Sequence, residues 1–142
     1  MIIYIDENMA PVLAKGFQLL QTPLNFQLKL QDAIEVKSIK EVFGEGTPDE
    51  DWIPLAGQEG ACVITQDYNI QRIRHQRDLC EKHGLGMFYF RPPSKNGFSY
   101  WEMVKLLVKH WEEIIKIASK KPKPFSYKIT SKSSSLESMD EK

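Results

Sequence analysis

The sequence lacks several features that would assign a protein to a class at once. It has two cysteines, Cys62 and Cys80, and their spacing is not that of a metal or redox site. No apolar run approaches the roughly 20 residues that a membrane-spanning helix needs, and no basic segment followed by a long apolar one stands at the start. We therefore expect a soluble, reduced, cytoplasmic protein that does not associate with membranes.

An excess of charge of one sign is also missing. Lysine plus arginine and aspartate plus glutamate number 19 each, so the net charge gives no sign of a polyanionic partner, although a local basic patch can still bind one. The three histidines, His75, His83 and His110, do not have metal-ligand spacing, and we assign them no role.

The sequence does have a regular alternation of apolar patterns. Short β-branched runs alternate with segments whose apolar residues recur at helical spacing. This alternation predicts an α/β fold, a three-layer α/β/α sandwich with a mostly parallel central sheet. The expected strands cover residues 2–5, 33–39, 61–65, 86–90 and 125–130, and the expected helices cover about 9–20, 47–60, 69–83 and 100–119.

The end of the chain differs in composition from the rest. Residues 131–142 are polar and rich in serine and charge, which predicts a disordered tail. Residues 1–130 have the length and apolar content of one folded domain.

Three acidic clusters stand beside the predicted strands and helices. Asp6 and Glu7 follow the first strand, and Asp67 closes the third. Asp49 and Asp51 lie in the first turn of the second helix. The carboxyl ends of parallel strands meet at one edge of a sheet, and carboxylates gathered there repel one another unless a cation such as Mg²⁺ or Mn²⁺ offsets their charge. The pattern predicts a metal-dependent site suited to phosphodiester hydrolysis.

Most of these acids also have a purely structural interpretation. Asp49 and Glu50 are favoured in a first helical turn by the helix dipole alone, with Thr47 as N-cap and Glu50 completing a capping box. Asp67 suits a turn or an N-cap equally well. Asp6 is harder to explain in this way, because it follows a buried strand.

Three motifs, in this order, resemble those of PIN-like domains. They are Asp-Glu-Asn at residues 6–8, Asp-Glu-Asp-Trp-Ile at residues 49–53, and Thr-Gln-Asp at residues 65–67. The sequence is most similar to a small bacterial subgroup with the motifs DEN, DEE(I/W) and TxD, over about residues 1–92. The resemblance implies an α/β/α sandwich and Mg²⁺- or Mn²⁺-dependent ribonuclease activity, as in VapC-type toxins of toxin–antitoxin pairs.

The resemblance also implies roles for individual residues. It gives metal binding and catalysis to Asp6, Asp49 and Asp67, and Asp51 competes with Asp49 because alternating acids leave the register open. Residues that would position the water or the ligands are Glu7, Asn8 and Asn69.

Two groups of residues suggest binding partners. Arg72, Arg74 and Arg77 follow the last acid on one helix and suit an RNA path, with a solvated helix face as the equal alternative. Trp101 and Trp111 lie on the long helix, and we expect both in the core of the protein. Such an aromatic stripe also suits a homodimer or an antitoxin interface.

The leading hypothesis is therefore a Mg²⁺- or Mn²⁺-dependent endoribonuclease that acts as the toxin of a toxin–antitoxin pair. One alternative is a PIN-like scaffold that binds without catalysis. Another is a receiver-like phospho-acceptor module. A receiver needs a lysine at the end of a later strand, and residues 86–90 are followed by Arg91.

Overall fold

The computed structural model describes residues 1–6 and 8–140 and has an α/β fold. Six strands form one sheet in the order β2-β1-β3-β4-β5-β6, in which the first five strands are parallel and β6 is antiparallel to β5. The predicted fold is confirmed. The strands are β1 (Ile2–Ile5), β2 (Glu35–Ser38), β3 (Cys62–Gln66), β4 (Gly86–Phe90), β5 (Phe125–Ile129) and β6 (Glu137–Ser138), and the helices are α1 (Val12–Gln27), α2 (Ile39–Phe43), α3 (Asp49–Gln58), α4 (Ile70–His83) and α5 (Tyr100–Lys120).

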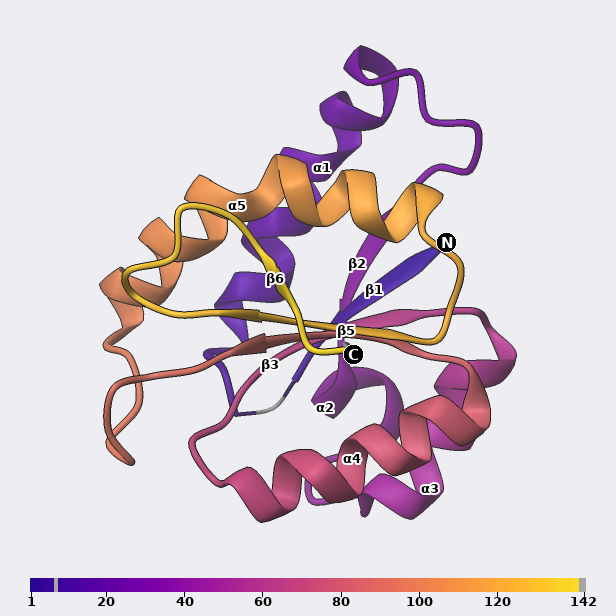
Figure 1. Ribbon diagram of the computed structural model, residues 1–142. Coiled ribbons are helices and arrows are strands. Elements are labelled where there is room, and N and C mark those ends of the chain that lie inside the picture. Colours follow the sequence, from indigo (N-terminus) through magenta and orange to yellow (C-terminus); the bar gives the residue numbers. More distant parts are fainter. Residues whose placement is uncertain (7, 141–142) are drawn as a thin grey trace.

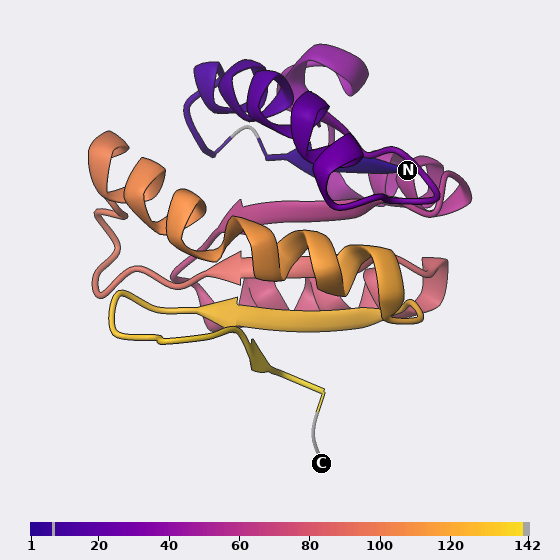
Figure 2. The same cartoon turned by 90° about the horizontal axis from the view of Figure 1, so that it is seen from above.

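Helices cover both faces of the sheet. Figure 1 shows α1 and α5 on one face and α3 and α4 on the other, and Figure 2 shows the arrowheads of the parallel strands pointing to the same edge. Each face has its own apolar cluster, one including Ile3, Ile64 and Trp111 and the other including Tyr4 and Tyr89. Because successive side chains of a strand point to opposite faces, the strands supply both clusters.

The centre of the sheet is the most deeply buried part of the fold. All five residues of β4 are buried, as expected for a parallel strand with helices on both sides. Gly86 opens this strand because a Cβ there would collide with the ring of Phe125 on the neighbouring strand.

The first helix is longer than predicted. Helix α1 begins at Val12 and continues through Pro23 to Gln27, beyond the expected end near residue 20. A further short helix, α2, directly follows β2, and the Ser38 side chain caps it by accepting a hydrogen bond from the Glu41 amide.

The predicted capping box at the start of α3 is wrong. Pro48 occupies the N-cap position and makes no side-chain cap. The Thr47 hydroxyl instead lies 2.8 Å from the Phe43 carbonyl oxygen and 2.9 Å from that of Gly44. The end of α2 therefore uses the hydroxyl that was expected to cap α3.

The prediction for α5 is correct for Trp111 and wrong for Trp101. Trp111 is buried, packs on Phe17 with ring centroids 4.5 Å apart, and donates an indole hydrogen bond to Gln21. Trp101 is 62% exposed, and Val108 on the same helix is 58% exposed. These two residues are seven positions apart and share a helical face that points away from the sheet.

The expected disordered tail is wrong for residues 131–140. Strand β6 pairs with β5 through Tyr127 and Lys128, and Leu136 is buried on the core. The Asp140 carboxylate accepts a hydrogen bond from the Ser126 amide. One large apolar side chain and a set of hydrogen bonds thus anchor a segment whose composition is otherwise polar. Within the described residues, no helix is both long and apolar enough to cross a membrane.

Candidate functional site

Two predicted acids lie at the carboxyl ends of neighbouring strands. Asp6 follows β1 and Asp67 follows β3, which pair in parallel. The Asp6 amide donates to the Ile64 carbonyl at 2.9 Å and the Asp67 amide donates to the Phe90 carbonyl at 3.2 Å, so both residues extend the sheet ladder. Each is only 8% exposed. The sheet therefore holds two carboxylates in fixed, largely buried positions.

The pleat of the sheet places Asp6 and Thr65 on one face. Tyr4 and Val63 pack in the cluster below α3 and α4, and side chains two residues apart on a strand share a face. Asp6 follows Tyr4 by two residues, and Thr65 follows Val63 by two. The Thr65 hydroxyl donates a 2.6 Å hydrogen bond to Asp6 Oδ2, which agrees with this placement.

Asp67 is held by the start of α4. Its Oδ1 accepts a hydrogen bond from the Asn69 amide at 2.8 Å, and its Oδ2 lies 3.5 Å from Arg72 Nη1. The Asn69 side chain caps α4 by accepting a hydrogen bond from the Arg72 amide. The residue expected to position water thus also orders the turn that carries Asp67.

Asp49 points inward from the first turn of α3. Its two oxygens accept hydrogen bonds from Trp52 Nε1 and Gln76 Nε2, each at 3.1 Å. Gln76 is buried, and its own oxygen accepts a 3.4 Å hydrogen bond from the Tyr89 hydroxyl. Asp51, the competing acid, is exposed on the surface of α3. The inward-facing acid of this cluster is therefore Asp49.

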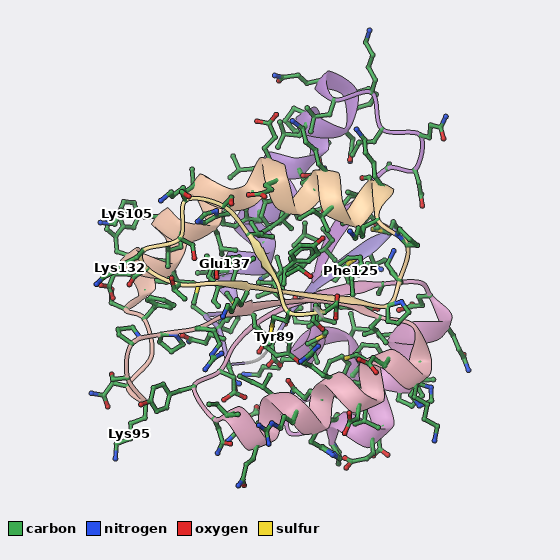
Figure 3. The ribbon with its side chains drawn as sticks, in the orientation of Figure 1. Tyr89, Lys95, Lys105, Phe125, Lys132 and Glu137 are labelled. Atoms are coloured by element: carbon green, nitrogen blue, oxygen red, sulfur yellow. The ribbon has the colours of Figure 1, made fainter. Side chains whose placement is uncertain are left out.

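Tyr89 lies near both Asp49 and Asp67. Figure 3 shows its side chain between the sheet and α4. Burial is the main cause that raises its pKa, and the nearby Cys80, Asp49 and Asp67 raise it further, while Arg77 opposes them. Asp49 and Asp67 are thus both close enough to act electrostatically on one buried phenol.

The described residues do not assemble a complete ligand cage. Across residues 1–6 and 8–140, no group of three or more histidine, cysteine, aspartate or glutamate side chains is arranged to hold a metal ion. Glu7 lies outside the described residues. What suits a hard cation is the pair Asp6 and Asp67, two buried oxygen ligands of like charge on adjacent strand ends. Asp49 is held by Trp52 and Gln76 and would have to exchange those bonds to join them.

A pocket of about 830 Å³ opens beside Asp67. Its walls come from the loop after β1, the loop from β3 to α4 and the loop from β4 to α5. Lys95 extends from the last of these loops, at the rim of the molecule (Figure 3). The polar lining residues include Asn8, Gln66, Asp67, Asn69, Arg72, Arg91, Lys95 and Asn96.

The three predicted RNA-binding arginines have different surroundings. Arg72 lines the pocket, and Arg74 is exposed on α4 without lining it. Arg77 is directed to the end of the chain, where its Nη2 donates to the Met139 carbonyl at 2.9 Å and lies 3.3 Å from Asp140 Oδ1. The structure therefore brings only Arg72 to the pocket.

Sequence reasoning missed several residues of this region. Gln76 gave a signal, because it stands between Ile73 and Cys80 at helical spacing and interrupts an apolar stripe. Arg91 and Lys95 gave only a weak signal, since they follow a buried strand by one and five residues.

One comparison with known proteins identifies a family for this chain. A sequence model described as a PIN-like domain matches residues 1–92, which span β1 to β4 and include Asp6, Asp49 and Asp67. No curated protein and no solved structure matches the chain. The matched segment is well over half of the 142 residues. The chain belongs to the PIN-like domain family, whose members are generally nucleases.

Proposed function

We propose that this protein is a Mg²⁺- or Mn²⁺-dependent endoribonuclease that hydrolyses phosphodiester bonds of RNA. The observation that carries the proposal is the pair of carboxylates on Asp6 and Asp67, each 8% exposed and each at the carboxyl end of a central strand. Carboxylates buried at the ends of adjacent strands carry a desolvation cost, and a bound divalent cation offsets that cost. Arg72 and the cationic pocket beside Asp67 provide a surface for phosphate groups.

The residues of the site have separate roles in this proposal. Asp6 and Asp67 hold the cation, and Asp49 serves as the third acid in preference to the exposed Asp51. A bound divalent cation supplies a nucleophilic water and stabilises the charge that develops on phosphorus. Thr65 fixes the orientation of the Asp6 carboxylate. Residues that line the approach and hold water or phosphate oxygens are Asn8, Asn69 and Arg72.

The cellular role we propose is that of a toxin with a cognate antitoxin protein, acting in the cytoplasm. It rests on the resemblance of the motifs at residues 6–8, 49–53 and 65–67 to those of PIN-like domains, which implies an activity like that of VapC-type toxins. The exposed Trp101 on α5 is one surface on which an antitoxin or a second copy of the chain could pack. Co-expression with the product of a small neighbouring reading frame tests this role, because an antitoxin should relieve any growth arrest that the protein causes.

Cleavage assays separate the catalytic proposal from its alternatives. Wild type and the Asp6→Asn and Asp67→Asn variants are incubated with total RNA and Mn²⁺ or with EDTA. We expect cleavage that requires Mn²⁺ and is lost in both variants. If wild type cleaves no RNA under any metal, the inactive scaffold replaces this proposal.

The matched pair Asp49→Asn and Asp51→Asn identifies the third acid. Both variants remove one charge from the same helical turn, so the effect on the helix dipole is similar. We expect a loss of activity of about tenfold or more for Asp49→Asn and near-wild-type activity for Asp51→Asn. The reverse order would assign the role to Asp51.

A further inference from the structure

We propose that the pocket beside Asp67 positions a single strand of RNA, with Tyr68 stacking on one base and Arg91 and Lys95 binding phosphates. This inference rests on the proposed function, because it assumes that the polyanion in the pocket is the ribonuclease substrate. It adds substrate-positioning residues on a loop after β4, opposite the helix on which the sequence predicted RNA contacts.

Tyr68 is placed as a stacking platform. It directly follows Asp67, lines the pocket and is 50% exposed. Its ring is therefore accessible to a ligand in a pocket that also contains Arg72, Arg91 and Lys95. Proteins that bind single strands combine this kind of ring with a positively charged groove, since every base offers a face for stacking.

Arg91 is fixed at the base of the pocket. Its amide donates to the Ile129 carbonyl at 2.8 Å, which ties the residue to the end of the sheet. Its Nε is buried and has no hydrogen-bond partner among the described residues. A guanidinium in this state gains from an anionic oxygen, because an unpaired buried donor carries a desolvation cost.

The loop that carries Lys95 is held in place by Gln66. The Gln66 amide group donates to the Asn8 carbonyl at 3.2 Å, and its oxygen accepts a 3.2 Å hydrogen bond from the Phe98 amide. One side chain at the end of β3 therefore joins the two outer loops of the pocket. Such bracing means that the walls are formed before a ligand binds, which reduces the entropy cost of binding.

The charge of the pocket favours a polyanion. Asp67 is paired with Arg72 at 3.5 Å. Arg91 and Lys95 take part in none of the salt bridges of the described residues, so two cationic groups remain for phosphates. A duplex would fit this arrangement poorly, because its bases are stacked on one another and cannot lie on Tyr68.

Binding measurements without catalysis test the proposal. The probe is a short fluorescein-labelled oligouridylate, titrated in EDTA so that no cleavage occurs, and the same strand annealed to oligoadenylate serves as the duplex. For Tyr68→Ala we expect Kd for the single strand to rise by about 5- to 100-fold, and Tyr68→Phe should restore it. The Arg91→Ala/Lys95→Ala variant should weaken binding and reduce the slope of log K against log salt by about 1.4.

The matched control is Lys120→Ala/Lys121→Ala, which removes two cations from a pocket at the opposite end of the strands, beside Met1. This control should keep wild-type affinity. The proposal is overturned if it loses as much affinity as the Arg91→Ala/Lys95→Ala variant, if Tyr68→Ala binds normally, or if the duplex binds as tightly as the single strand. Thermal melting of each variant confirms that it is folded.

The same assays separate this inference from the proposed function. If the single strand binds as expected but wild type cleaves neither it nor total RNA with any metal, the ribonuclease proposal fails and the positioning residues stand. If wild type cleaves and the variants at Tyr68, Arg91 and Lys95 bind and cleave normally, the ribonuclease proposal stands and this inference fails.

Discussion

Thr65 donates a 2.6 Å hydrogen bond to the carboxylate of Asp6, and both side chains are buried at the carboxyl ends of β1 and β3. The two residues are 59 positions apart in the sequence. The parallel pairing of β1 with β3 brings them together. A hydroxyl that donates to a buried carboxylate stabilises its ionised form and fixes its direction.

Replacement of Thr65 by valine should therefore impair both folding and function. Valine keeps the shape of threonine and removes the donor, so we expect the free energy of unfolding to fall by about 1–3 kcal/mol. Urea unfolding measures this loss, and RNA cleavage as a function of Mn²⁺ concentration should show a weaker metal response. Thr65→Ser keeps the hydroxyl and should stay near wild type. If Thr65→Val and Thr65→Ser have the same free energy of unfolding and the same Mn²⁺ response, this hydrogen bond contributes to neither.

Replacement of Gln76 by glutamate should make stability depend on pH. The new carboxylate would replace a donor that lies 3.1 Å from Asp49, in a buried position. Burial and the like charge would raise its folded-state pKa above the unfolded value of about 4.3. The variant should therefore be least stable at neutral pH and regain stability as the pH falls toward that value. Urea unfolding at several pH values checks this, and a variant as stable as wild type at neutral pH would contradict the Asp49–Gln76–Tyr89 connection.

His110 should contribute a pH dependence to the wild-type protein. Burial lowers its pKa, Lys109 lowers it further, and Glu113 acts in the opposite direction. The side chain is 2% exposed and Nε2 has no partner among the described residues. As the pH falls below about 6.5, the unfolded chain takes up a proton that the folded chain does not, so stability falls.

The variant His110→Leu removes this titrating group. Compared with wild type, its free energy of unfolding should decline less between about pH 7 and 5, by at most about 1.4 kcal/mol per pH unit. His83→Leu, at the end of α4, is the control and should keep the wild-type slope. An unchanged slope in His110→Leu would show that this histidine does not drive the pH dependence.

Removal of residues 131–142 should destabilise the protein. The deletion takes away the buried Leu136, whose burial alone is worth about 1.5–3 kcal/mol. It also removes the partners of Arg77 and of the Ser126 amide. Thermal melting of a chain that ends at Thr130 should show a lower midpoint, whereas a chain that ends at Asp140 keeps these contacts and should melt like wild type. Equal melting of all three chains would support the tail that the sequence predicted.

The sequence was informative where one physical signal dominated. The apolar runs before Asp6 and Asp67 predicted buried parallel strands, and strand ends in such a sheet share an edge. The order of the elements followed from the same runs. The structure agrees at both positions.

Competing local signals account for the errors. Thr47 had the sequence of an N-cap, but its hydroxyl contacts the end of α2, a helix that the sequence did not predict. Trp101 is aromatic and lies on an amphipathic helix, yet it is on the exposed side of that helix and not on the side that packs against the sheet. Leu136 alone in a polar segment was too weak a signal for a folded end. Gln76 interrupts an apolar stripe, but its bond to Asp49 and the surroundings of Arg91 depend on tertiary structure.

The most direct test of a catalytic cation at Asp6 and Asp67 is the Mn²⁺ dependence of RNA cleavage by wild type, Asp67→Asn and Asp51→Asn in parallel. We predict cleavage by wild type and Asp51→Asn that rises with Mn²⁺ and stops in EDTA, and a rate at least about 100-fold lower for Asp67→Asn. Cleavage by Asp67→Asn at the wild-type rate, or wild-type cleavage that persists in EDTA, would contradict a catalytic cation held by the buried carboxylates.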